Sequence, residues 1–146
     1  MQRELITFEV AGQIFGLDIM AIREIRAWSP AARLPRVPSY VAGVVNLRGA
    51  ILPVVDLAAR LGWHSTEPTP RHAMIVTQVH GQSRGLIVDS VSDIVTVPAD
   101  SLQPPPPMAQ SGVVPFLEGL AALDDRMVMV LDLEALNSDQ PLFEAA

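Results

Sequence analysis

An internal repeat constrains the fold of this chain more than any other feature of its sequence. Residues 41–57 recur in altered form 76 positions later, as residues 117–133. Both copies keep an early glycine and an apolar run that ends in Asp-Leu, but Asn46 and Arg48 of the first copy are not kept in the second. We therefore expect the two copies to share their architecture, and we treat the residues that differ as candidates for function.

A second set of matches indicates that the whole chain is a duplication. At an offset of 69 residues, Gly16–Leu17 matches Gly85–Leu86, Ile22 matches Val91, Glu24 matches Asp93 and Ile25 matches Ile94. Short apolar segments with turn residues about every eight to twelve positions, and only single-turn helices, are typical of small β-barrels. The fold class that we predict is mainly β, with two five-stranded barrel subdomains packed together and a few short helices.

Local patterns predict the strands and turns up to residue 97, and they also predict the short helix that follows Asp132. Alternating apolar residues predict strands, glycines mark the turns between them, and aspartates can cap short helices. The predicted hairpins are 4–17, 41–55 and 73–88, the further strands are 22–28 and 91–97, and the caps are Asp18, Asp56 and Asp132. Because side chains alternate along a strand, we expect Ile22 and Glu24 to share one face.

The length of 146 residues suits one domain made of two similar halves. We expect a single domain over 1–146, with approximate subdomains 14–80 and 1–13 plus 81–146, between which the chain is exchanged.

The absence of cysteine excludes disulfides and thiolate metal sites, and suits a reducing cytosol. We expect no secretory leader, and the sequence contains no apolar run of about 18 residues. We therefore expect a cytoplasmic protein without direct membrane insertion.

The charge balance argues against nucleic acid as a partner. The net charge is −6, and all ten basic residues are arginines. Arginines gather between positions 23 and 36 and carboxylates between 124 and 144, an asymmetry that can steer a protein partner, although an ordinary solvated surface explains it equally well. The high hydropathy with few aromatic residues indicates strands buried on both faces or exposed apolar docking surface.

One sequence motif suggests an enzyme, but its context does not. Gly81–Gly85 matches the G-x-S-x-G nucleophile elbow around Ser83, which requires a strand, a turn, a helix and a later histidine. Predicted strands flank the motif on both sides, and all three histidines precede Ser83. A hairpin turn is the favoured interpretation, and a serine hydrolase using Ser83 is the remote alternative.

The sequence contains no recognisable metal-binding or cofactor-binding motif. His72 and His80 lie on one predicted strand, where eight residues separate them by about 26 Å, too far to share an ion. No glycine-rich phosphate loop is present, and the chain has no lysine. We expect no catalytic residues, no cofactor and no metal.

The four consecutive prolines from Pro104 to Pro107 allow another kind of binding. A polyproline II segment is pre-ordered and can serve as a ligand for an SH3-like groove. A stiff spacer between strands is the alternative, and we favour it.

A patch of three residues is the best candidate for binding a protein. Arg48 stands at a predicted hairpin tip beside Gly49, where its side chain is displayed. Arginine combines a fixed charge with a planar donor fork and is enriched among residues that dominate interface energies. Glu24 and Ile22 lie on the strand after Asp18, so an apolar residue is flanked by opposite charges.

Much of the sequence resembles the bacterial chemotaxis adaptor family CheW. The resemblance is carried by Asp18–Ile25, Tyr40–Gly49 and Ile51–Leu57, and it continues through Gly85–Val97, Leu117–Leu120 and Asp125–Met127. It covers nearly the whole chain. The four prolines and the lack of lysine depart from the family's commoner pattern.

This resemblance implies two intertwined SH3-like barrels and a non-catalytic scaffold. It implies that the chain couples the cytoplasmic tips of chemoreceptors to the histidine kinase CheA in a two-component signalling array. Receptor binding would involve Ile22, Glu24 and Arg48, with the receptor's helical hairpin in the groove between the barrels. The regulatory domain of CheA is related to the adaptor, so the two would pack as neighbours in rings.

The resemblance further implies a cytoplasmic protein that is recruited to membrane receptor arrays. A length of 146 residues leaves no room for a kinase or receiver domain beside two barrels, which favours a stand-alone adaptor. The output of the pathway stays open between flagellar swimming, pilus motility and another response.

Overall fold

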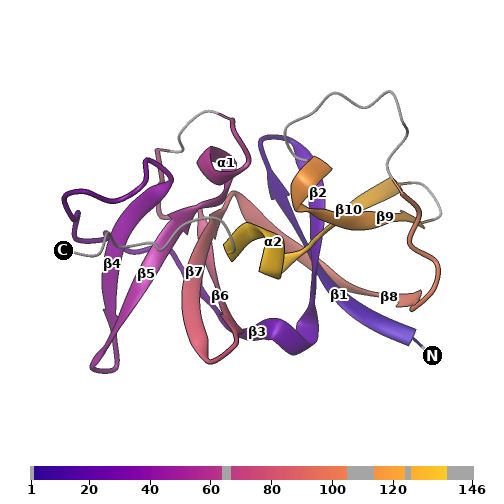
Figure 1. Cartoon of the computed structure of the whole chain (residues 1–146), viewed down its shortest axis with the longest axis horizontal. Coiled ribbons are helices and arrows are strands. Elements are labelled where there is room, and N and C mark those ends of the chain that lie inside the picture. Colours follow the sequence, from indigo (N-terminus) through magenta and orange to yellow (C-terminus); the bar gives the residue numbers. More distant parts are fainter. Residues whose placement is uncertain (1, 64–66, 105–113, 124–125, 138–146) are drawn as a thin grey trace.

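The computed structural model of the protein describes residues 2–63, 67–104, 114–123 and 126–137. Two curled β-sheets lie side by side, with two short helices between them (Figure 1). In chain order the elements are β1 Gln2–Val10, β2 Gln13–Asp18, η1 Ile19–Ala21, β3 Ile22–Ala27, β4 Val41–Leu47, β5 Ala50–Asp56, α1 Leu57–Arg60, β6 Ala73–Val79, β7 Gln82–Val88, β8 Ser90–Pro98, η2 Val114–Phe116, β9 Leu117–Leu123, β10 Arg126–Leu131 and α2 Leu133–Asn137.

The predicted hairpins, strands and helix caps are confirmed. Each predicted cap accepts a backbone N–H from the helical turn that follows it, at 2.9 Å for Asp18, 3.5 Å for Asp56 and 3.0 Å for Asp132. Of the predicted polyproline segment only Pro104 is described, so residues 105–107 and any contact they make lie outside the described residues.

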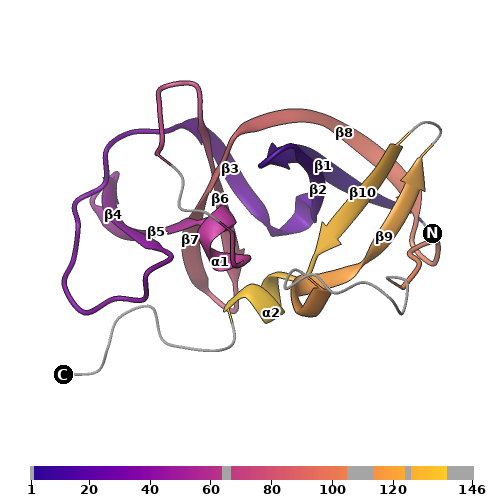
Figure 2. The same ribbon diagram turned by 90° about the horizontal axis from the view of Figure 1, so that it is seen from above.

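Each sheet combines strands from both halves of the chain. Sheet A has the order β8-β1-β2-β10-β9, and sheet B has the order β3-β6-β7-β5-β4 (Figure 1, Figure 2). The offset of 69 residues relates β1, β2 and β3 to β6, β7 and β8, and the offset of 76 relates β4 and β5 to β9 and β10. The two orders are therefore the same pattern with the halves exchanged.

The sheets divide the chain differently from the predicted subdomains 14–80 and 1–13 plus 81–146. Sheet A takes its strands from residues 2–18 and 90–131, and sheet B takes them from residues 22–88. The predicted boundaries at 13/14 and 80/81 cut through two hairpins. These hairpins stay whole, because a two-residue turn places the two joined strands side by side in antiparallel pairing.

Parallel pairing joins the two halves. In sheet B, Val54 of β5 pairs with Gly85 of β7, and in sheet A, Val130 of β10 pairs with Gly16 of β2. The two pairs correspond residue for residue under the two sequence offsets. The duplication inferred from the sequence is thus reproduced in the strand register.

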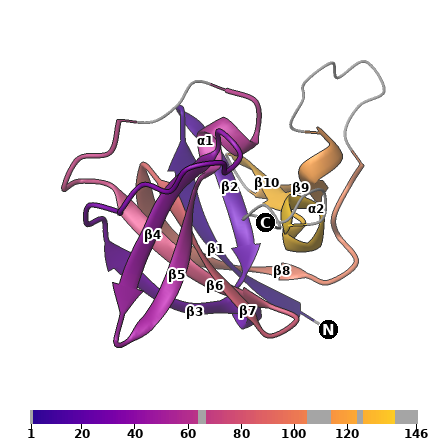
Figure 3. The same ribbon diagram turned by 60° about the vertical axis from the view of Figure 1, so that its left-hand side comes forward.

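A single bridge on each sheet brings its two edges together. After β3, the N–H and C=O of Ala32 bond to Val44 of β4 at 2.8 and 2.9 Å, and after β8, Gln103 and Leu120 form the equivalent bridge. The curl of sheet B that results is visible in Figure 3. The expected barrels are therefore SH3-like curled sheets, which within the described residues close through one bridge rather than a continuous ladder. We call the line where the edges meet the seam.

Three clusters of buried side chains hold the sheets together. The largest, the joint core, lies between the sheets and includes Phe8 and Phe15, whose stacked rings have centroids 6.1 Å apart. A smaller cluster fills each curl, around Val128 in sheet A and Met74 in sheet B. Full burial of a side chain such as Phe8 contributes about 1.5 to 3 kcal/mol.

The early glycine of each repeat copy sits at a close approach between backbones. In β4 a register shift between Val41 and Gly43 gives Gly43 a φ of 149°, and a Cβ there would lie 2.3 Å from the carbonyl oxygen of Ala32. The equivalent Gly119 is less crowded, since its Cβ would lie 3.0 Å from Leu102. Glycine at these positions permits the bridge that closes each seam.

We expect Gly43→Ala to lower the free energy of unfolding by about 2 kcal/mol or more, because backbone strain and steric overlap add. Gly119→Ala should cost less. Gly12→Ala, where φ is 79° but no atom lies within 4 Å, is the control for strain alone and should cost about 1 to 2 kcal/mol. Urea unfolding gives the free energy of unfolding of each of the three variants. Equal reductions for Gly43→Ala and Gly12→Ala would contradict the steric explanation.

Candidate functional site

The tip of the β4–β5 hairpin displays Arg48 as the sequence predicts. Arg48 and Gly49 both have positive φ, 53° and 87°, as a two-residue type I′ turn requires. The side-chain oxygen of Asn46 accepts a hydrogen bond from the N–H of Gly49 at 2.8 Å. The two polar residues that only the first repeat copy carries therefore build and occupy this tip.

Arg48 meets Glu24 across the seam of sheet B. Strands β3 and β4 are opposite edges of the hydrogen-bonded order, but the curl brings Arg48 Nη2 to 3.1 Å from Glu24 Oε1. Arg26 Nη1 lies 3.6 Å from the same oxygen. The Arg48 side chain remains 69 % exposed, so donors are left for a partner and the pair itself contributes at most about 1 kcal/mol.

Ile22 does not share a face with Glu24, and the prediction that it would is wrong. A register shift falls between them, so that Ile22 pairs with Thr77 whereas Glu24 pairs with Val76. The extra residue, Arg23, reverses the alternation of side chains. Ile22 packs half-buried against the joint core, and Glu24 stands on the other side of the strand.

A groove of about 560 Å³ lies between the two sheets. Its apolar lining comes from the turn before β3, the end of β6 and the start of α2, and its polar lining is largely acidic. The lining residues are Asp18, Met20, Ala21, Gln78, Val79, Glu118, Leu131, Asp132, Leu133 and Glu134. Met20 is 88 % exposed, the highest value among the exposed large apolar side chains of the described residues.

Sequence reasoning missed Met20. The neighbouring apolar residues of the same turn, Ile19 and Ala21, are partly buried, so the sequence did not indicate which of the three is exposed.

Polar contacts link the segments on both sides of the groove. Arg3 donates to both carboxylate oxygens of Glu118, at 2.6 and 3.2 Å, and to Asp18 at 3.2 Å. The bond to Glu118 is the main cause of a raised pKa of the Arg3 guanidinium. On the other wall, His80 Nε2 lies 2.6 Å from Glu134 Oε1, which links the β6–β7 turn to α2. These contacts connect the segments that line the groove.

Sheet A has its own ion pair at the corresponding seam. Asp93, which matches Glu24 in the repeat, lies 3.0 Å from Arg126 Nη2. Its carboxylate also accepts a hydrogen bond from the buried hydroxyl of Thr7, while the N–H of Asp93 donates to that hydroxyl at 3.2 Å. The Thr7 bond first, and Arg126 second, lower the pKa of Asp93.

The structure gives the enzyme alternative no support. Ser83 lies in β7, opposite Gln78 of β6, so strands flank the G-x-S-x-G motif as predicted and the required helix does not follow. Among the described residues, no three His, Cys, Asp or Glu side chains come together as metal ligands do. None of the helices in the described ranges is long and apolar enough to cross a bilayer.

Two intertwined SH3-like sheets, with a groove of mixed apolar and acidic lining between them, are the architecture of a protein-binding scaffold. The chain belongs to the CheW-like domain family, which matches residues 4–140. It is 49 % identical over 137 residues to the probable chemotaxis protein CheW of Rhizobium etli, covering 94 % of this chain and 88 % of that protein. With the chemotaxis protein CheW of Rhizobium meliloti, identity is also 49 %, over 134 residues that cover 92 % and 86 % of the two chains.

A solved structure supports the same assignment. The scaffolding protein TtCheW from Thermoanaerobacter tengcongensis matches with a TM-score of 0.85 and 32 % identity, over 95 % of this chain and 94 % of that one. The family resemblance, the mainly β fold and the scaffold rather than enzyme class expected from the sequence are confirmed.

The Asp93 site predicts a pH dependence of stability. Because the pKa of Asp93 is lower in the folded protein than its ordinary value of 3.8, its stabilisation is complete above that pH and is lost as the pH falls toward the folded-state pKa. We expect Asp93→Asn to lower the free energy of unfolding at pH 7. Near pH 3, the free energies of the variant and the parent protein should differ less. Urea unfolding at both pH values measures this.

Asp100→Asn is the matched control, since Asp100 makes no hydrogen bond or ion pair with any described residue. The difference in free energy of unfolding between Asp100→Asn and the parent protein should be the same at both pH values. If the difference for Asp93→Asn is also the same at both pH values, the role of the Asp93 carboxylate is contradicted.

Proposed function

We propose that this protein is a scaffold that couples chemoreceptors to the histidine kinase CheA in a chemotaxis-type signalling array. The observation that carries the proposal is the exposed Met20 in the groove between the two sheets. Burial of an exposed apolar side chain such as Met20 by a partner is favourable, because it removes apolar surface from water. Membership of the CheW-like family supports the identity of the partners.

The receptor's helical hairpin binds in the groove between the sheets, with Met20 and Val79 contacting its apolar residues. Ile22 follows the Met20 turn directly and is half-buried, so it supports this surface and offers only part of its side chain. Glu24 and Arg48 lie at the seam and set the orientation of the receptor through charge. Affinity then comes from apolar burial, and register comes from the charged pair.

The second partner is the regulatory domain of CheA, which packs beside this chain in rings or larger arrays. This assembly recruits the protein from the cytoplasm to receptors in the membrane. The names of the relatives at 49 % identity favour chemotaxis over pilus motility as the output. Co-sedimentation with receptor cytoplasmic fragments and CheA tests the proposal, and a chain that sediments with neither would refute it.

Arg48→Ala should weaken receptor binding by about 1 to 4 kcal/mol, the range for an interface arginine. The free energy of unfolding should stay within about 1 kcal/mol of the parent, because the pair with Glu24 is exposed. Arg126→Ala, which breaks the corresponding pair in sheet A, is the control and should keep receptor affinity. Unchanged binding by Arg48→Ala would remove this residue from the site.

Met20→Glu should reduce receptor binding by about tenfold or more, because it puts a charge into an apolar contact. Thermal unfolding should not change, since the side chain is 88 % exposed. Met127→Glu provides the comparison, as Met127 is 53 % exposed but lies on β10 outside the groove. If the two variants bind receptor equally well, the groove is not the receptor site.

A further inference from the structure

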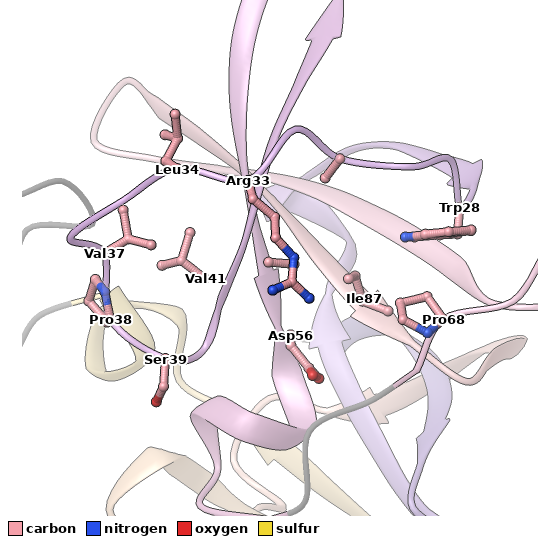
Figure 4. Close-up of a pocket in the computed structure, with 12 residues that line it drawn as sticks. Trp28, Arg33, Leu34, Val37, Pro38, Ser39, Val41, Asp56, Pro68 and Ile87 are labelled. Atoms are coloured by element: carbon pink, nitrogen blue, oxygen red, sulfur yellow. The ribbon is translucent and has the colours of Figure 1, made fainter.

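The open end of the sheet B barrel contains a cavity of about 460 Å³ that the groove and the seam do not include. It lies beneath the loop between β3 and β4, and Figure 4 shows Arg33 extending into the space between Val37 and Val41 on one side and Trp28 and Ile87 on the other. Ligand cavities of about 300 to 1,000 Å³ occur preferentially at such positions, including the mouths of β-barrels.

The rim of this cavity is preformed. Prolines at 30, 35 and 38 restrict the backbone of the loop that covers it. The bridge between Ala32 and Val44 anchors the loop in the middle, and the N–H of Val41 donates to the carbonyl of Pro38 at 2.9 Å at its end. A ligand would therefore enter a shaped site without ordering a long segment.

The lining combines one guanidinium, one carboxylate and one hydroxyl, from Arg33, Asp56 and Ser39, with apolar side chains. Arg33 makes no hydrogen bond or ion pair with any described residue, although its side chain lies over the cavity. The planar fork of arginine fits a carboxylate with two parallel hydrogen bonds. The indole of Trp28, Pro38 and Pro68 offer flat apolar surfaces for the rest of a ligand.

Asp56 limits the charge of the ligand. It is 6 % exposed, lines the cavity and caps α1 through the N–H of Ala59. Its negative charge opposes a second anionic group on the ligand. One carboxylate near Arg33 is compatible with the lining, whereas a dianion such as phosphate is disfavoured.

We propose that this cavity binds a small monocarboxylate with an apolar, aromatic body. The carboxylate accepts hydrogen bonds from Arg33, and the ring packs against Trp28 and the cavity prolines. The site lies at the start of β4, near Ala42, whereas Arg48 lies six residues further along, about 20 Å away along an extended strand. It is therefore separate from the proposed receptor site.

The test is a titration of the full-length protein, labelled with ¹⁵N, by NMR. The probes are indole-3-acetate and phenylacetate, with indole-3-acetamide as the neutral counterpart. We expect saturable shifts of the amide signals of Trp28, Arg33 and Val41 with both acids, and affinity at least about tenfold weaker for the amide.

Two substitutions in the same loop complete the test. Arg33→Gln should weaken binding of both acids about tenfold, while Arg36→Gln, a loop arginine outside the cavity lining, should leave it unchanged. The proposal is overturned if neither acid causes saturable shifts in the millimolar range, if the amide binds as well as the acid, or if Arg33→Gln keeps the parent affinity.

Discussion

The parallel pairings of β5 with β7 and of β10 with β2 are the contacts on which the rest of the structure depends. Each pairing joins a hairpin of one half to a strand of the other, so neither sheet can be completed by one half alone. Gly85 and Gly16 lie at the two junctions, where a Cβ would come 2.6 Å from the sulfur of Met74 in β6 and 2.9 Å from Val128 in β10. The exchanged sheets curl around their own small cores while sharing the joint core.

The curl then creates both parts of the candidate site. It brings the two edges of sheet B together, which places Glu24 beside Arg48, and it sets the ends of β6 and β9 opposite each other across the groove. The two seams carry ion pairs at matching places, but the cation in sheet A comes from the first residue of β10 and not from the hairpin tip. The two halves thus close their sheets in the same way, but they differ at the hairpin tip, where only the first half carries Arg48.

Several elements of the fold were predictable because their causes are local. The turn at Arg48 and Gly49 and the three aspartate caps depend on residues that are neighbours in the chain. The side of β3 from which Ile22 projects was not predictable. It depends on a bulge opposite Thr77 and Val76, which are more than fifty residues away, and strand periodicity carries no information on where a partner strand shifts its register.

By itself, the sequence determined the duplication, the strands and turns, the family and the display of Arg48, since repeats, glycines and caps act within short stretches of chain. Only the tertiary structure decided which strands share a sheet, that Met20 lies exposed in a groove, and that Ile22 faces the joint core. These features follow from pairings between distant strands and from the volume left between curled sheets. Backbone hydrogen bonds at a strand edge can form with many partner strands. The packing of side chains in the joint core is specific, and it therefore decides which strands pair.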